Sequence, residues 1–105
     1  MGLEAATNAY QSALRWGDFE SARGLLSPEL RGDEELPQHL QDLRLTRYEV
    51  VQPPLIGADD RATQTVNIEY LFEYNQILRR LTDRQVWRWD EQEKVWWLQS
   101  GLPDF

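Results

Sequence analysis

The sequence predicts an α+β fold in which short helices pack on an antiparallel sheet. Apolar residues recur at helical spacing over the first 45 residues, whereas from Leu45 onward they alternate with polar residues as they do in strands. The chain of 105 residues suffices for one domain, over 1–105. Five Trp, four Tyr and three Phe residues supply the large apolar side chains that a core of this size needs.

The first expected helix spans residues 3–16. Its buried face is an apolar stripe with spacings of three, four and four residues: Leu3, Ala6, Tyr10 and Leu14. Gly17 stands where a left-handed cap would end this helix. Asp18 stands where an N-cap would begin the second helix, which is expected over 18–26.

A third helix is expected over residues 34–43, because leucines repeat there at helical spacing. Pro37 falls inside this range, so the regular helix should begin near that residue. Before it, Ser27 and Pro28 form an N-cap followed by a proline at the first helical position, and Gly32 should stop that turn.

Four strands are expected in the rest of the chain, over residues 45–52, 62–74, 77–89 and 94–100. Pro53 and Pro54 should end the first strand. A two-residue loop between the second and third strands would place Ile68 opposite Asp83. A four-residue turn before the last strand would place Trp87 opposite Trp96. One face of the sheet is then apolar and can pack on the helices, whereas the other is mixed.

Two stretches carry a resemblance to a known family. The first helix leads into the run from Tyr10 to Phe19, and the last two strands carry the motif Trp-x-Trp-Asp-x4-Val-Trp-Trp-Leu. Together with helices that precede a long meander, these stretches resemble the nuclear transport factor 2-like superfamily, including uncharacterised bacterial members. The resemblance covers roughly residues 3–103. It implies that three helices close a strongly curved four-stranded sheet into a cone with a pocket inside.

Composition excludes several classes of function. The 18 acidic residues outnumber the 11 basic ones, which argues against a nucleic-acid groove. No run of 18 apolar residues exists, so no transmembrane segment is expected. The chain has no cysteine and one histidine, His39, which is expected on a helix surface rather than in a metal site. The acidic groups near Glu34 and Asp59 lack calcium-loop spacing, and no cofactor or metal is expected.

Asp83 is the candidate catalytic residue. The predicted pairing turns its carboxylate toward the helices, where desolvation would raise its pKa and suit it to act as a base. The resemblance implies a similar role, because enzymes of that superfamily use an interior carboxylate with a partner group. The hydroxyl of Tyr70 or of Tyr10 would be that partner. The alternative is a structural Asp83 that bonds backbone groups or meets an arginine at the surface.

The helix-facing side of the sheet also suggests a pocket for a small apolar ligand. Aromatic walls with a few polar groups are typical of such sites. A filled core is the alternative for the same residues: Tyr10, Leu14, Tyr70, Phe72, Trp87, Trp89 and Trp96.

The mixed face predicts a homodimer interface. Arg80, Arg84 and Arg88 recur every four residues on one strand and therefore point the same way, with Glu69 and Trp97 on neighbouring strands. Arg and Trp are enriched in interface cores, and many proteins of the resembled family pair through this face. A solvated outer face is the alternative.

These observations favour a non-enzymatic domain that binds a ligand or a protein and dimerises through its outer sheet face. One alternative is a small isomerase- or hydratase-like enzyme that uses Asp83. Another is a structural accessory domain of an envelope lipoprotein. The expected location is the bacterial cytoplasm, or the periplasm or envelope if an export signal has been removed.

Overall fold

The computed structural model describes residues 2–32 and 35–105. The helical elements of this part precede the strands: α1 (Leu3–Arg15), α2 (Phe19–Gly24), the one-turn helix α3 (Pro28–Arg31) and the 3-10 turn η1 (Gln38–Asp42). The strands are β1 (Leu43–Ile56), β2 (Arg61–Phe72), β3 (Arg79–Asp90) and β4 (Val95–Leu98).

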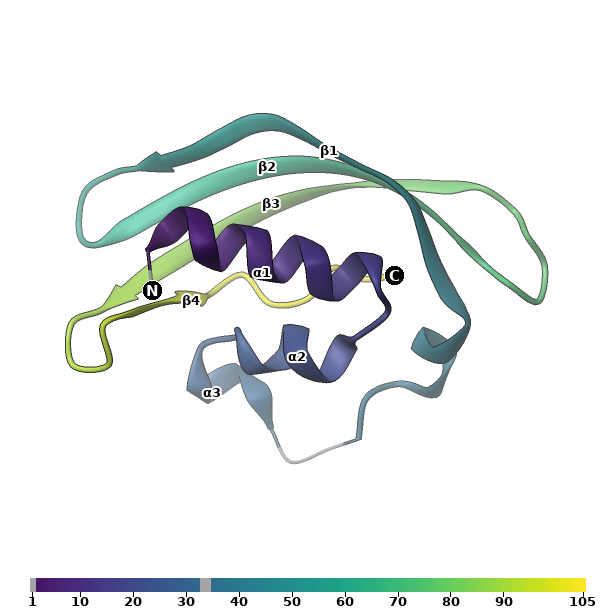
Figure 1. Ribbon diagram of the computed structural model, residues 1–105, viewed down its shortest axis with the longest axis horizontal. Helices are drawn as coiled ribbons and strands as arrows, with labels where there is room; N and C mark the ends of the chain where they lie inside the picture. Colours follow the sequence, from purple (N-terminus) through teal and green to yellow (C-terminus); the bar gives the residue numbers. More distant parts are fainter. Residues whose placement is uncertain (1, 33–34) are drawn as a thin grey trace.

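The four strands form one antiparallel sheet in the order β1-β2-β3-β4. This arrangement confirms the predicted α+β class and the meander. In Figure 1 the three long strands arch over α1, which lies against one face of the sheet. We call this face the inner face and the opposite one the outer face.

Helix α1 forms where the apolar stripe predicts it. Its residues Ala6, Tyr10 and Leu14 are buried against the sheet. The helix ends because Gly17 adopts a φ of +70°, a left-handed conformation that favours glycine. Asp18 then caps α2, since its carboxylate accepts a hydrogen bond from the backbone N–H of Ser21 at 3.2 Å. Both predicted caps are confirmed, and the two helices are slightly shorter than expected.

The third predicted helix is wrong. Glu34, its expected first residue, lies outside the described residues, and the remainder holds only the 3-10 turn η1. Pro37 has an extended conformation with φ −53° and ψ 134°, so the turn starts only after it. Leu43 already belongs to β1, where it pairs with Phe72. Leu43 is therefore paired in the sheet, although the helical spacing of the leucines predicted it in a helix.

Strand β1 runs past its predicted end, through Pro53 and Pro54. Proline lacks the N–H that a central strand needs, but β1 is an edge strand and tolerates it. Register shifts interrupt the pairing of β1 with β2 between Leu45 and Arg47, and again twice between Val50 and Leu55. These irregularities bend the strand.

The core lies between the inner face and the helices. Tyr10 of α1 meets Trp87 of β3 edge to face, with ring centroids 5.9 Å apart. Phe105 at the chain end packs on Phe19 and Tyr70 at centroid distances of 6.3 and 5.1 Å. The segment after α2 joins the edge of the sheet, because the backbone N–H of Leu98 donates to the Leu25 carbonyl at 2.8 Å.

Candidate functional site

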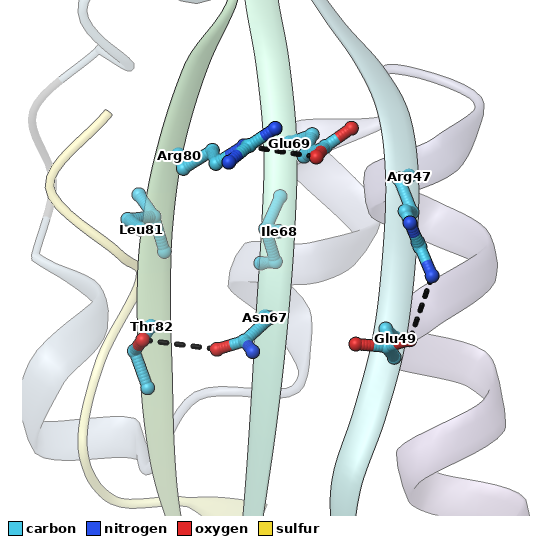
Figure 2. A pocket seen from close by; sticks show the side chains of 8 residues that line it. All are labelled: Arg47, Glu49, Asn67, Ile68, Glu69, Arg80, Leu81 and Thr82. Atoms are coloured by element: carbon cyan, nitrogen blue, oxygen red, sulfur yellow. Dashed lines mark hydrogen bonds and ion pairs between the residues drawn. The ribbon is translucent and has the colours of Figure 1, made fainter.

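The outer face carries a polar depression of about 590 Å³ over β1, β2 and β3. Figure 2 shows the eight residues that line it. We call its six polar members the outer-face patch: Arg47, Glu49, Asn67, Glu69, Arg80 and Thr82. Strand alternation brings them together, because polar residues of three neighbouring strands point away from the core.

Pairs within the chain satisfy the groups of the outer-face patch. The Arg80 guanidinium lies 2.9 Å from the Glu69 carboxylate. Arg47 and Glu49, two residues apart on β1, form a second ion pair at 2.7 Å. The Thr82 hydroxyl donates to the Asn67 side chain at 3.0 Å. Exposed ion pairs such as these stabilise a fold by about 1 kcal/mol or less, so their groups can exchange partners at low cost.

The predicted dimer residues fall into two groups. Glu69 and Arg80 belong to the outer-face patch, and Arg84 is exposed nearby with no ion-pair partner among residues 2–32 and 35–105. Arg88 and Trp97 lie farther along, at the end of the sheet that α3 reaches.

Side chains of helix α3 contact Arg88 and Trp97. Its Glu29 carboxylate lies 3.7 Å from the Arg88 guanidinium, and the Arg31 guanidinium lies 4.7 Å from the Trp97 ring centroid. The Trp97 indole N–H also donates to Asp90 at 3.0 Å, and this bond is the main cause of the lowered pKa of that carboxyl. These contacts leave Glu69, Arg80 and Arg84 as the open part of the predicted interface.

The inner face buries a polar cluster at its centre. The Gln85 side-chain oxygen accepts from Gln64 at 3.2 Å and from the Trp87 indole at 3.1 Å. Its amide nitrogen donates to the Tyr48 hydroxyl and to the Asp83 carboxylate, each at 3.0 Å. Polar groups are thus paired inside an otherwise apolar core, as buried polar groups generally are.

Asp83 lies on the inner face, as predicted, and is 7% exposed. Burial raises the pKa of its carboxyl, while the hydrogen bond from Gln85 lowers it. The charge of Asp83 acts on Tyr10 and Tyr48, whose pKa values burial already raises, that of Tyr48 to about 12. The Tyr10 hydroxyl is buried without a hydrogen-bond partner in the described part.

The predicted partner hydroxyl is therefore only partly identified. Tyr10 lies in the field of Asp83 as expected. Tyr70 instead packs its ring on Phe72 and Phe105, with centroids 5.9 and 5.1 Å away. Sequence reasoning missed Tyr48, although its place in a strand two residues from Val50 was a signal that it could face inward.

The residues of the predicted ligand pocket fill space rather than surround it. Tyr10, Leu14, Tyr70, Phe72, Trp87 and Trp96 are buried members of the core. Trp89 packs on Trp96 at a centroid distance of 5.5 Å, and these two also border a surface depression of about 460 Å³ beside Gly2. Neither this depression nor the outer-face patch is lined by Asp83.

A groove of about 780 Å³ runs between the N-terminal half of α1 and the end of β1. We call it the α1–β1 groove. Five apolar and four polar residues line it, among them Leu3, Thr7, Val50, Leu55, Ile56 and Gln64. Sequence reasoning missed this groove; the apolar pair that follows the two prolines was the available signal.

His39 and the acidic side chains are the remaining features that the sequence singles out. The His39 ring nitrogen Nε2 lies 3.2 Å from the Phe105 carbonyl oxygen at the surface. The described residues contain no group of three or more His, Cys, Asp or Glu side chains that could hold a metal ion. Among them, too, no helix is long and apolar enough to cross a membrane.

Comparisons of the chain with protein-family models, with curated proteins and with solved structures find no match.

Proposed function

We propose that this chain is a non-enzymatic binding domain that forms a homodimer through its outer sheet face. The observation that carries the proposal is the outer-face patch, in which two arginines and two glutamates share one shallow depression beside Arg84, which has no ion-pair partner in the described part of the chain. Such a surface is self-complementary, because each copy offers both signs of charge. Helices followed by an antiparallel meander also agree with a nuclear transport factor 2-like domain, which is part of the same proposal.

The strand order favours one orientation of the two copies. A two-fold axis parallel to β2 would bring β3 of one copy over β1 of the other. Arg84 would then lie two residues along the strand from the level of Glu49 of the second copy, within reach of a long side chain, although Arg80 would lie over Arg47. An axis perpendicular to the strands would instead stack the row of Arg80 and Arg84 on its own copy. We propose the first arrangement, in which each Arg84 has a carboxylate within reach.

The enzymatic alternative depends on the buried Asp83 and the unpartnered hydroxyl of Tyr10. The carboxylate is hydrogen-bonded to Gln85, and core side chains surround it. A base must lie within hydrogen-bond reach of the proton that it abstracts. This geometry supports a structural Asp83 better than a catalytic one.

Sedimentation velocity of four proteins tests the dimer. We expect the unaltered chain to sediment as a dimer and Arg84→Glu to weaken association by about tenfold or more. Adding Glu49→Arg to that variant should restore pairing. The matched control is Arg15→Glu, which reverses an exposed arginine on α1 and should change nothing. An unaltered chain that stays monomeric up to about 100 μM would contradict the proposal.

A further inference from the structure

Two arginines of the outer face lie directly opposite each other. Arg61 of β2 pairs in register with Arg88 of β3. Both side chains point outward, because their neighbours along the strands, Ala62 and Trp87, are buried on the inner face. Opposite residues of an antiparallel pair have Cβ atoms roughly 5 Å apart, and like charges at this distance destabilise the sheet. We call Arg61 and Arg88 the arginine pair.

The carboxylates of α3 and β3 compensate the arginine pair only in part. The Glu29 carboxylate lies 3.7 Å from the Arg88 guanidinium, which is longer than a hydrogen bond of roughly 2.7–3.2 Å. Asp90 already accepts hydrogen bonds from the Trp97 indole and from two backbone N–H groups of the turn after β3. Both guanidinium groups can be reached from solvent, since Arg61 is exposed and the Arg88 side chain is 30% exposed.

The turn before β2 does not supply the missing negative charge. Asp59 and Asp60 precede Arg61 there, but Arg61 forms no ion pair with any residue in the ranges 2–32 and 35–105. Asp60 instead lines the depression beside Gly2. Arg84 lies on the same outer face and adds a further positive charge. This end of the outer face therefore carries more positive than negative charge, in a chain whose formal charge is −7.

The arginine pair fits a ligand with two negative charges and several oxygens. A guanidinium is planar and donates two parallel hydrogen bonds to a phosphate or a carboxylate. A phosphate ester carries a charge of about −1.5 to −2 at neutral pH, so one group can neutralise both arginines, whereas a carboxylate neutralises one. The hydroxyl of the exposed Thr63, the next outward residue of β2, adds a donor beside them. We propose that the arginine pair binds a phosphate group, either free or carried as a monoester by a small molecule.

Titration of the ¹⁵N-labelled protein with inorganic phosphate tests this site by NMR. At neutral pH and constant ionic strength, we expect the Nε resonances of Arg61 and Arg88 to shift saturably with a Kd below about 10 mM. Acetate should bind at least about fivefold more weakly, because it carries one charge. Tighter binding of phenyl phosphate would support the site and identify an ester as the ligand. Tighter binding of inorganic phosphate would support the site and identify the free ion.

Substitutions at Arg61 locate the binding. Arg61→Gln breaks no ion pair in the described part of the chain, and it should weaken phosphate binding by about fivefold or more because one guanidinium is lost. Arg61→Lys keeps the charge but not the two parallel donors, so its Kd should lie between those of Arg61→Gln and the unaltered chain. The matched control is Arg15→Gln, at an exposed arginine of α1, which should leave the Kd unchanged.

Urea denaturation gives a second measurement on the same proteins. Phosphate should raise the midpoint of the unaltered chain, because a ligand that binds only the folded state stabilises it. Without phosphate, Arg61→Gln should have a higher midpoint than the unaltered chain, since one of two opposed like charges is gone. Added phosphate should then raise the midpoint of Arg61→Gln much less.

Three results would overturn the proposal. They are shifts of equal size at Arg15 and at the arginine pair, acetate binding as tight as phosphate binding, and an unchanged Kd in Arg61→Gln. The site lies within one chain and requires no second copy. The homodimer through the outer-face patch is tested separately by the sedimentation of Arg84→Glu, so either proposal can fail while the other stands.

Discussion

Gln85 holds together the polar side chains that the inner face buries. An amide offers two acceptor lone pairs and two N–H donors. The oxygen of Gln85 accepts from Gln64 and Trp87, and its nitrogen donates to Tyr48 and Asp83. All four positions are thus used, which fixes the orientation of the amide. The neighbouring groups depend on this one side chain for their hydrogen bonds.

Gln85→Leu is expected to lower the free energy of unfolding by about 3 kcal/mol, because it leaves several buried polar groups unpaired at once. Chemical denaturation measures the change. The matched control is Gln38→Leu at an exposed position of η1, where we expect a change within about 0.5 kcal/mol. Equal effects of the two substitutions would show that the buried cluster contributes nothing to stability.

Asp83 should make the stability of the protein depend on pH. The pKa of an unfolded aspartate is about 3.9, and burial raises that of folded Asp83. Between these two values the folded protein binds more protons than the unfolded chain. The free energy of unfolding therefore falls as pH rises through that interval, and it stays lower above it.

Asp83→Asn removes this ionisation while its side chain keeps an oxygen for the bond from Gln85. At neutral pH we expect the variant to be more stable than the unaltered protein by about 1–2 kcal/mol. The gain should vanish below the pKa of an unfolded aspartate. Urea denaturation across the acidic range gives both values, with the exposed Asp104→Asn as control. A gain that persists unchanged at low pH would exclude ionisation as its cause.

At the scale of elements, the turn from α1 to α2 depends on Gly17. Its φ of +70° is strained for any residue with a Cβ, although a Cβ there would meet no atom within 4 Å. Gly17→Ala should therefore lower the free energy of unfolding by about 1 kcal/mol. Gly24→Ala is the matched control, since Gly24 lies in α2 and has equal room. It should raise stability by about 0.5 kcal/mol, so thermal unfolding should show shifts of opposite sign.

The sequence predicts which way the strand residues face better than it predicts their partners. Val66 rather than Ile68 lies opposite Asp83, and Trp89 rather than Trp87 lies opposite Trp96. Each register differs from the prediction by two residues, because the turns lie at other positions than expected. A shift by two leaves every side chain on its predicted face. The apolar and mixed faces could thus be predicted although the turns were not.

For the candidate sites, too, strand alternation predicts which face a residue lies on but not the irregular parts of the structure. Glu69 and Arg80 could be placed on one face from alternation alone, and the structure pairs them at 2.9 Å. The α1–β1 groove was missed, because it arises where bulges and Pro53-Pro54 disturb the alternation of β1. Local irregularity of this kind has no fixed period in a sequence. The cover of Trp97 by Arg31 likewise depends on how α3 docks, a tertiary contact.

At the scale of the whole molecule, the helices and the sheet share one core. Buried residues of α1 and α2 and of all four strands belong to the same apolar cluster. Helices of 13 and 6 residues are too short to be stable alone in water. Without them, the inner face with Trp87 and Trp96 would lie open to solvent. Neither part has a stable folded state of its own to occupy.

This interdependence predicts a single cooperative unfolding transition. Far-ultraviolet circular dichroism reports chiefly on the helices, whereas tryptophan fluorescence reports chiefly on the sheet, where Trp87 and Trp96 are buried. The two signals should change at the same urea concentration, as in two-state unfolding.

Leu14→Ala, at a position of α1 that is 1% exposed, should lower the free energy of unfolding by about 2–4 kcal/mol. It should move both signals together although Leu14 belongs to a helix. A helical signal that disappears at lower urea than the fluorescence change would show instead that the sheet folds without its helices.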